Sequence, residues 1–305
     1  MKILKMLLLL ADKDDRFIVK ALTILRSQYE GNLDIVGITG EDAVSLEINE
    51  KRVPFISLEN AVNLEYDLLL SFGGFGLGMN QLKSYCNRHN LDSTRLIGDW
   101  IVCIPGFTVP KYHQLVNSSL SIFSLHCFGG IMSHLMGLPF KSPFVNLYMM
   151  EQEFIKVLKH PKVYLSEELE LIDTKMHYDA TLGEFKFPVY NMGNVSLYMQ
   201  HYPDFEEAVT KWHERKARIN WYNILAVMFT DDPIILEQFD KLPYGKKVCF
   251  VPFKSDKSSA FYISPNLNKE MRLAEKVTNF GWGNIYYYDP FDLLLYGKKT
   301  QLIEM

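Results

Sequence analysis

Residues 223–253 read NILAVMFTDDPIILEQFDKLPYGKKVCFVPF, and this stretch decides the fold class. It begins with an apolar run, continues with a helical segment that ends near Asp240, and closes with a second apolar run. In a strand–helix–strand unit of this kind the two strands run parallel and the helix covers one face of their sheet. The stretch therefore predicts an α/β fold built on a mostly parallel sheet.

The same alternation extends outward along the chain. Further strands are predicted at residues 3–10, 33–39, 53–58, 66–72, 95–102, 119–127, 144–150, 195–202 and 260–264, with polar, hairpin-like sequence at 161–193. Pro105, Gly106 and Pro110 mark a linker-like stretch. We expect two open, mostly parallel sheets with flanking helices, one in a domain over residues 1–110 and one in an α/β domain over residues 111–305.

The first strand-to-helix turn lacks the residues of a dinucleotide site. Such turns carry G-x-G-x-x-G so that backbone amides approach a pyrophosphate. Residues 11–16 read ADKDDR, with no glycine and three carboxylates that would repel a phosphate. The glycines of FGGFGLG at 72–78 lack the fingerprint spacing, and a turn is favoured over a ligand loop. The first half resembles a degenerate Rossmann-like module, a scaffold or regulatory unit without NAD, and we expect no cofactor.

Charge and cysteine usage narrow the function classes. The net charge is −4, with 12 basic and 14 acidic residues up to residue 116 and 20 and 22 after it, so neither part is suited to a nucleic-acid backbone. Four scattered cysteines without a C-x-x-C pair indicate neither a zinc site nor a disulfide framework, and free thiols favour the cytoplasm. The apolar run at 6–11 is too short for a signal peptide, and no later run is long enough to span a bilayer.

Reactive side chains follow three predicted strands of the second half. Cys127, His201 and Asp231 each stand where a strand ends and a helix begins. Because ligands of open parallel sheets bind at the carboxyl ends of the strands, we expect these side chains to share one crevice. A helix N-terminus would lower the pKa of the Cys127 thiol, His201 would take its proton, and Asp231 or Asp232 would orient the imidazole.

Two small residues and one alternative complete this hypothesis. Gly129 and Gly130 would let a ligand approach the turn after Cys127. The alternative is that Cys127 is a small buried residue and His201 bonds to a backbone carbonyl. Metal binding by Cys127, His126 and His201 is disfavoured because no ligand spacing supports it.

Several motifs of the second half occur together in one known family. HCFGG at 126–130, GLPFKSPFVNLYM at 137–149, QHYPDFEEAVTKWHERKARINWYN at 200–223 and FDKLPYGKKVCF at 239–250 resemble the bacterial domain of unknown function nineteen-nineteen, often described as an exopolysaccharide biosynthesis protein. The likeness covers roughly residues 110–265. The family's first motif commonly reads NNCWGG; here Leu125-His126 replaces both asparagines and Phe128 replaces the tryptophan. The resemblance implies a role in cell-surface polysaccharide synthesis.

A sugar or nucleotide-sugar ligand is compatible with two further groups. Arg215, Lys216 and Arg218, followed by Asn220, would hold a diphosphate, and the aromatic residues of 280–288 would offer stacking platforms. The alternative for the basic residues is a solvated helix end. The alternative for the aromatic residues is a core, or a subunit interface as in a homo-oligomer. Two functions follow: a transferase or hydrolase with Cys127 as nucleophile, or a non-catalytic sugar-binding or assembly protein. A nicotinamide-dependent enzyme is disfavoured.

Overall fold

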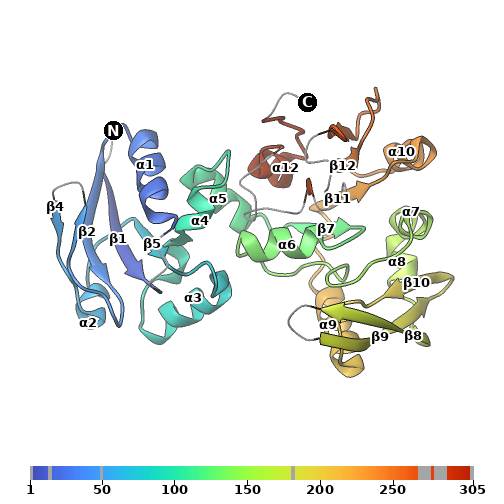
Figure 1. The fold of residues 1–305 in the computed structure, drawn as a ribbon, viewed down its shortest axis with the longest axis horizontal. Coiled ribbons are helices and arrows are strands. Elements are labelled where there is room, and N and C mark those ends of the chain that lie inside the picture. Colours follow the sequence, from blue (N-terminus) through green and yellow to red (C-terminus); the bar gives the residue numbers. More distant parts are fainter. Residues whose placement is uncertain are drawn as a thin grey trace. The chain divides into compact units, whose positions relative to one another are not determined.

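The chain divides into two compact units in the computed structural model. The first comprises Met1–Tyr112 with His134–Gly137, and the second comprises His113–Ser133 with Leu138–Met305. Each unit contains a parallel sheet with helices beside it, so the predicted α/β class is confirmed (Figure 1). The predicted domain boundary between residues 110 and 111 stays a prediction. The structure describes residues 3–12, 16–48, 51–179, 183–266, 276–277 and 287–302.

The first unit is built on one four-stranded parallel sheet, in the order β2-β1-β5-β6, with a small antiparallel pair β3-β4. The middle of β1 is fully buried, as its continuous apolar sequence predicts. Its elements are β1 Leu4–Leu10, α1 Ile18–Gln28, β2 Leu33–Thr39, β3 Leu46–Ile48, β4 Lys51–Val53, α2 Leu58–Ala61, β5 Leu68–Phe72, α3 Gly78–Arg88, η1 Ser93–Arg95, β6 Leu96–Gly98 and α4 Asp99–Val102; α5 Val109–Asn117 follows.

Two predicted strands of the first unit are largely wrong. Residues 53–58 contribute only Val53 to β4, because Ser57 accepts a hydrogen bond from the Asn60 backbone and caps a short helix instead. Of residues 95–102, only Leu96–Gly98 form a strand, and helix α4 begins at Asp99. At Ser57 a local side-chain cap outweighs an apolar pattern, whereas α4 begins after Gly98 without a side-chain cap.

The glycine-rich segment 72–78 lies beside the turn after β1. Gly73 has φ +74°, and a Cβ there would stand 1.9 Å from the backbone oxygen of Asp12. Only glycine allows this approach, since both the backbone angle and the space exclude a side chain. The backbones of the two loops that follow β1 and β5 are therefore in contact, which favours the turn interpretation over the ligand loop. Residues Lys13–Asp15 of the predicted phosphate turn lie outside the described residues.

The second unit combines a parallel and an antiparallel sheet, with the orders β13-β12-β11-β7 and β10-β9-β8. The opening stretch 223–253 forms β11, α10 and β12 as predicted, with β11 and β12 parallel. Side chains of both sheets and of α7, α9 and α10 share one hydrophobic core. The elements are β7 Ser121–Ser124, α6 Phe128–Leu135, α7 Glu151–Lys159, α8 Pro161–Tyr164, β8 Leu169–Asp179, β9 Gly183–Met192, β10 Val195–Tyr198, α9 Phe205–Ala217, β11 Ile224–Phe229, α10 Pro233–Asp240, β12 Lys246–Val251, β13 Ala260–Tyr262 and α12 Pro290–Tyr296.

The prediction that residues 195–202 belong to the parallel sheet is wrong. Gly193 and Asn194 form a two-residue turn between β9 and β10, so β10 pairs antiparallel with β9. The predicted strand at 144–150 is also wrong, because only Tyr148 makes an isolated bridge, to Tyr198. No described helix has the length and apolarity that crossing a bilayer requires.

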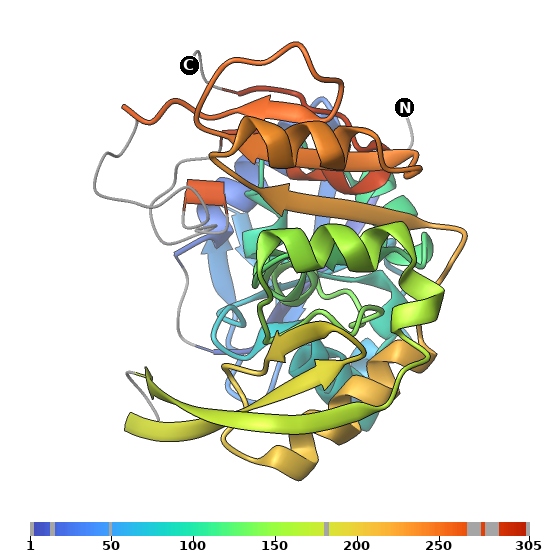
Figure 2. The same ribbon diagram turned by 90° about the vertical axis from the view of Figure 1, so that its right-hand side faces the viewer.

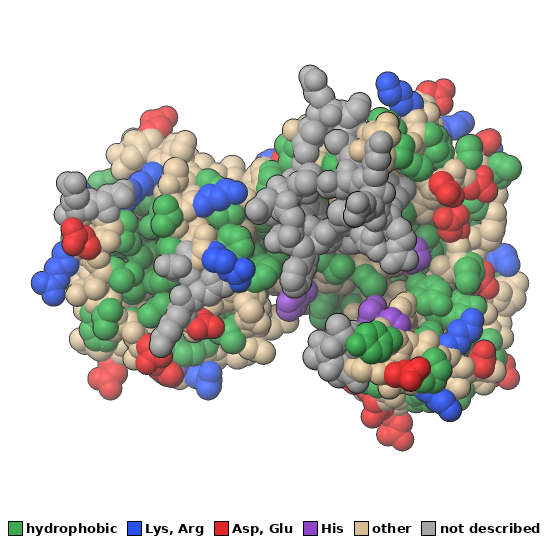
Figure 3. Space-filling view, viewed as in Figure 1, with side chains coloured by type: hydrophobic (Ala, Val, Ile, Leu, Met, Phe, Trp, Pro, Cys, Tyr) green, Lys and Arg blue, Asp and Glu red, His purple; other side chains and the backbone are tan. Residues whose placement is uncertain are grey.

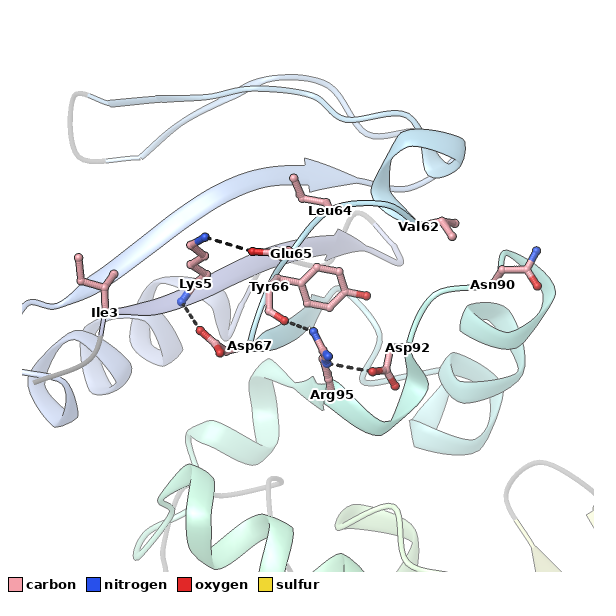
Figure 4. A pocket seen from close by; sticks show the side chains of 10 residues that line it. All are labelled: Ile3, Lys5, Val62, Leu64, Glu65, Tyr66, Asp67, Asn90, Asp92 and Arg95. Atoms are coloured by element: carbon pink, nitrogen blue, oxygen red, sulfur yellow. Dashed lines mark hydrogen bonds and ion pairs between the residues drawn. The ribbon is translucent and has the colours of Figure 1, made fainter.

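The first unit also carries a cavity of about 590 Å³ (Figure 4). It lies where β1, β5 and β6 begin, at the edge opposite to the one where parallel sheets bind ligands. Its cations already have partners: Arg95 Nε is 2.9 Å from Asp92 Oδ2, and Lys5 Nζ is 3.9 Å from Glu65 Oε2. We assign no ligand to this cavity.

Candidate functional site

Cys127 lies in the turn between β7 and α6. The Ile131 amide donates to the Cys127 carbonyl oxygen (2.9 Å), so Cys127 precedes the first helical turn. Ser124 holds the turn: its Oγ accepts from the Gly129 amide (2.9 Å) and donates to the His126 carbonyl (2.8 Å). The side chain of Cys127 is half-buried, whereas Cys86, Cys103 and Cys249 are buried.

The two glycines after Cys127 are explained by internal packing. A Cβ on Gly129 would stand 2.9 Å from Ser124 Oγ, and one on Gly130 would stand 3.0 Å from Val145 Cγ1. Both contacts are closer than side-chain carbons normally make, so α6 needs glycines to lie against β7 and Val145. A ligand role for Gly129 and Gly130 stays a prediction.

His201 is positioned by the irregular segment around Asn146. Its backbone amide donates to the Asn146 carbonyl oxygen (3.3 Å), and the segment follows β10 directly. The residue is exposed. His201 therefore reaches the site from the end of an antiparallel strand and not, as predicted, from the parallel sheet.

The thiol and the imidazole lie within hydrogen-bond reach. Cys127 Sγ is 3.5 Å from His201 Nε2, although the residues are 74 positions apart in sequence. This is inside the range in which sulfur forms hydrogen bonds, and free enzymes often hold such pairs at a loose distance. The arrangement allows His201 to accept the thiol proton while the sulfur attacks an electrophile.

The expected lowering of the thiol pKa is wrong. Burial raises the pKa of Cys127, and the hydrogen bond to its own backbone opposes this only in part. The physical cause is desolvation, which disfavours the charged thiolate. The thiol is thus protonated at neutral pH, so a reaction at sulfur needs a base at the moment of attack.

Asp231 lies at the same edge of the parallel sheet as Cys127, because β7 and β11 are adjacent and Ser124 pairs with Val227. It belongs to an acidic group around Glu151. Burial raises the pKa of Glu151, the charges of Asp231 and Asp232 add to this, and a hydrogen bond from Thr230 Oγ1 (3.0 Å) opposes it. Asp232 also caps α10. The role of Asp231 in orienting His201 stays a prediction.

Two side chains beside His201 were not predicted. The rings of His177, on β8, and His201 are 5.7 Å apart and nearly perpendicular. Gln200 Nε2 is 3.1 Å from His177 Nδ1. The same Gln200 nitrogen is 3.5 Å from His177 Nε2, so the amide lies against the imidazole ring, and which ring nitrogen accepts depends on the tautomer. The sequence offered no signal for His177, since it comes from a polar hairpin strand whose pairing brings it here.

Two stacked pairs of rings involve His126, the neighbour of Cys127, and Tyr198, the last residue of β10. His126 stacks on Phe229 with 5.8 Å between centroids, and Tyr148 stacks on Tyr198 at 4.6 Å. Lys175 Nζ lies 4.7 Å from the centre of the Tyr198 ring. Histidine and hydrophobic side chains lie together on the visible face of this unit (Figure 3).

The predicted aromatic platform at 280–288 is not formed by its described members. Tyr287 and Tyr288 are buried, and the Tyr288 hydroxyl donates to the Val277 carbonyl (3.0 Å), so these two rings belong to a core. Residues Phe280–Asn284 and Tyr286 lie outside the described residues.

The residues predicted to hold a diphosphate make contacts within the protein. Arg215 is buried; its Nη1 donates to the Val145 carbonyl (3.2 Å) and to the Tyr202 hydroxyl. Arg218 pairs with Glu214 at 2.9 Å on the exposed face of α9. Asn220 donates to the Ser119 carbonyl (3.1 Å) and ties the α9–β11 loop to β7. These contacts give all three side chains a structural role, and a ligand role for Arg215, Arg218 and Asn220 stays a prediction.

Among the described residues, no group of three or more His, Cys, Asp or Glu side chains is arranged to hold a metal ion. The fold and the site define an α/β protein whose second unit presents a half-buried thiol to an exposed imidazole. The chain belongs to the family described as a domain of unknown function (DUF1919), which it matches over residues 102–297. A protein of Haemophilus influenzae described as uncharacterised is 31% identical over 184 residues, which cover 59% of this chain and 84% of that relative.

Proposed function

We propose that this chain is a Cys/His enzyme of cell-surface polysaccharide metabolism, a transferase or hydrolase that acts from the cytoplasm. The observation that carries the chemistry is the 3.5 Å approach of Cys127 Sγ to His201 Nε2 on an accessible surface. Free cysteines support a reducing compartment. The polysaccharide link rests on the resemblance of the sequence motifs.

The pair suits acyl transfer. His201 Nε2 accepts the thiol proton as Sγ bonds to the carbonyl carbon of an ester, and the imidazolium then gives that proton to the leaving alcohol as the carbon–oxygen bond breaks. Water, or the hydroxyl of a sugar, next attacks the thioester while His201 accepts its proton. The thiol then recovers a proton from His201, so the cycle needs no external oxidant or reductant.

The test uses p-nitrophenyl acetate as the probe. We expect a burst of nitrophenol and an acetyl group on Cys127, found by peptide mass. His201→Ala should slow the burst at neutral pH by about 100-fold or more, because general-base catalysis contributes that much. Selective alkylation by iodoacetamide is not sufficient evidence, since burial of the other three thiols already predicts it.

The controls separate chemistry from stability. His213→Ala changes an exposed histidine of α9 in the same unit and should leave the burst unchanged. Cys127→Ser should abolish the acetyl adduct. Equal burst rates for His201→Ala and His213→Ala would show that the His201 imidazole does not act as the base. That result would rule out the proposed chemistry.

The second candidate is a non-catalytic protein that binds a sugar or nucleotide-sugar. It is favoured by the stacked rings of Tyr148 and Tyr198, since aromatic rings offer apolar faces to a sugar and the Tyr148 ring lies 6.5 Å from that of His126, the neighbour of Cys127. In that case Cys127→Ser would leave sugar binding intact, and Tyr198→Ala would abolish it.

A further inference from the structure

The strand β8 is an exposed edge. It spans Leu169–Asp179 and lies last in the sheet order β10-β9-β8. Figure 2 shows the β8–β9 hairpin extending at the lower left of the view. Four of its large apolar side chains are open to solvent: Leu171 is 49% exposed, Ile172 47%, Met176 53% and Tyr178 73%. A long apolar edge of this kind is a template for another strand unless it is shielded.

The charges on this edge are complementary to themselves. In an antiparallel pairing of two β8 strands about Thr174, Asp173 of each copy faces Lys175 of the other. Ile172 lies at the register irregularity between Leu171 and Asp173, so it is left out of this pairing. Asp173 and Lys175 stand on the same face of the sheet, because they oppose Val189 and Phe187 of β9. Two cross-strand ion pairs therefore form together on one face, which stabilises this register.

The neighbouring registers are excluded by the same charges. Centring the pairing on Asp173 places two carboxylates opposite each other, and centring it on Lys175 places two ammonium groups opposite each other. A slip of one residue takes the ion pairs apart and moves side chains to the wrong face. The sequence of the edge thus specifies one partner register.

We propose that this chain forms a two-fold homodimer through β8, in which the two three-stranded sheets join across Thr174. The occupant of the edge is a second copy because the charges of Asp173-Thr174-Lys175 are complementary to their own reverse. The joined strand also carries His177, so dimer formation holds in place the ring that lies beside His201.

Charge reversal tests the pairing. In sedimentation equilibrium, the wild-type chain should be a dimer, and Asp173→Lys or Lys175→Asp should each weaken association tenfold or more. A mixture of the two variants should form heterodimers again, because each Lys then faces an Asp. Matched controls on the inner strand β9, Glu184→Lys and Lys186→Asp, should leave the dimer unchanged.

Cross-linking tests the register. In a Cys127→Ser background, Thr174→Cys should be joined to a second copy by a short bis-maleimide, whereas Thr210→Cys on the exposed face of α9 should not. A wild-type monomer at all concentrations would overturn the proposal. A dimer that both single charge reversals leave intact would also overturn it. So would binding of a different protein to β8 by a chain that does not self-associate.

Discussion

At Glu151 the surroundings of one carboxylate oppose its ionisation. Burial raises its pKa, and the negative charges of Asp231 and Asp232 act in the same direction. A carboxyl whose pKa is higher in the folded state contributes stability that is complete below its ordinary pKa of about 4.3 and is lost as the pH rises through the higher folded value.

Glu151→Gln should therefore make the protein more stable than wild type at pH 7, with a smaller difference at acid pH. The amide oxygen of glutamine still accepts the hydrogen bond from Thr230. Urea unfolding of both proteins at the two pH values measures the difference. Glu168→Gln, at an exposed position, is the control and should show no such pH dependence. A variant less stable than wild type at pH 7 would contradict the prediction.

The turn between β9 and β10 decides how His201 reaches the site, because it makes β10 antiparallel to β9. Gly193 has φ +62°, and the nearest side-chain atom to a Cβ there would be 3.6 Å away, so space is ample and only the backbone angle demands glycine. Gly193→Ala should lower the free energy of unfolding by about 1 kcal/mol, the usual cost of a left-handed residue. Gly245→Ala, with open space and no positive φ, should cost less. Equal losses in thermal unfolding would contradict this.

Elements with local signals were predicted well, and elements that depend on pairing were not. Strand β11 and helix α10 follow from an apolar run, the Asp232 cap and Pro233. Strand β10 has a similar apolar run, but its direction depends on the turn at Gly193 and on the hairpin before it. Segment 144–150 is not a strand, although Phe144, Leu147 and Met149 are buried in the core, because its backbone makes only the isolated bridge at Tyr148.

At the scale of the whole molecule, the first unit is expected to bind no nicotinamide cofactor. The carboxyl ends of β1 and β5 are adjacent, but the Gly73 backbone lies against Asp12 between them, where a pyrophosphate would need space. Titration with NADH, followed by its fluorescence, should show no micromolar binding. A saturable enhancement that Asp12→Ala alters would contradict this prediction.

The sequence by itself determined the α/β class, the core strands of both parallel sheets and the candidacy of Cys127 and His201, because apolar periodicity and strand-end positions are local properties. The tertiary structure alone decided that the imidazole arrives on an antiparallel hairpin, that His177 and Gln200 stand beside it, and that Arg215 is engaged inside the protein. Burial of the thiol also reversed the expected direction of its pKa shift. These outcomes depend on strand pairing and on burial by residues far apart in the chain, and no local sequence pattern indicates either.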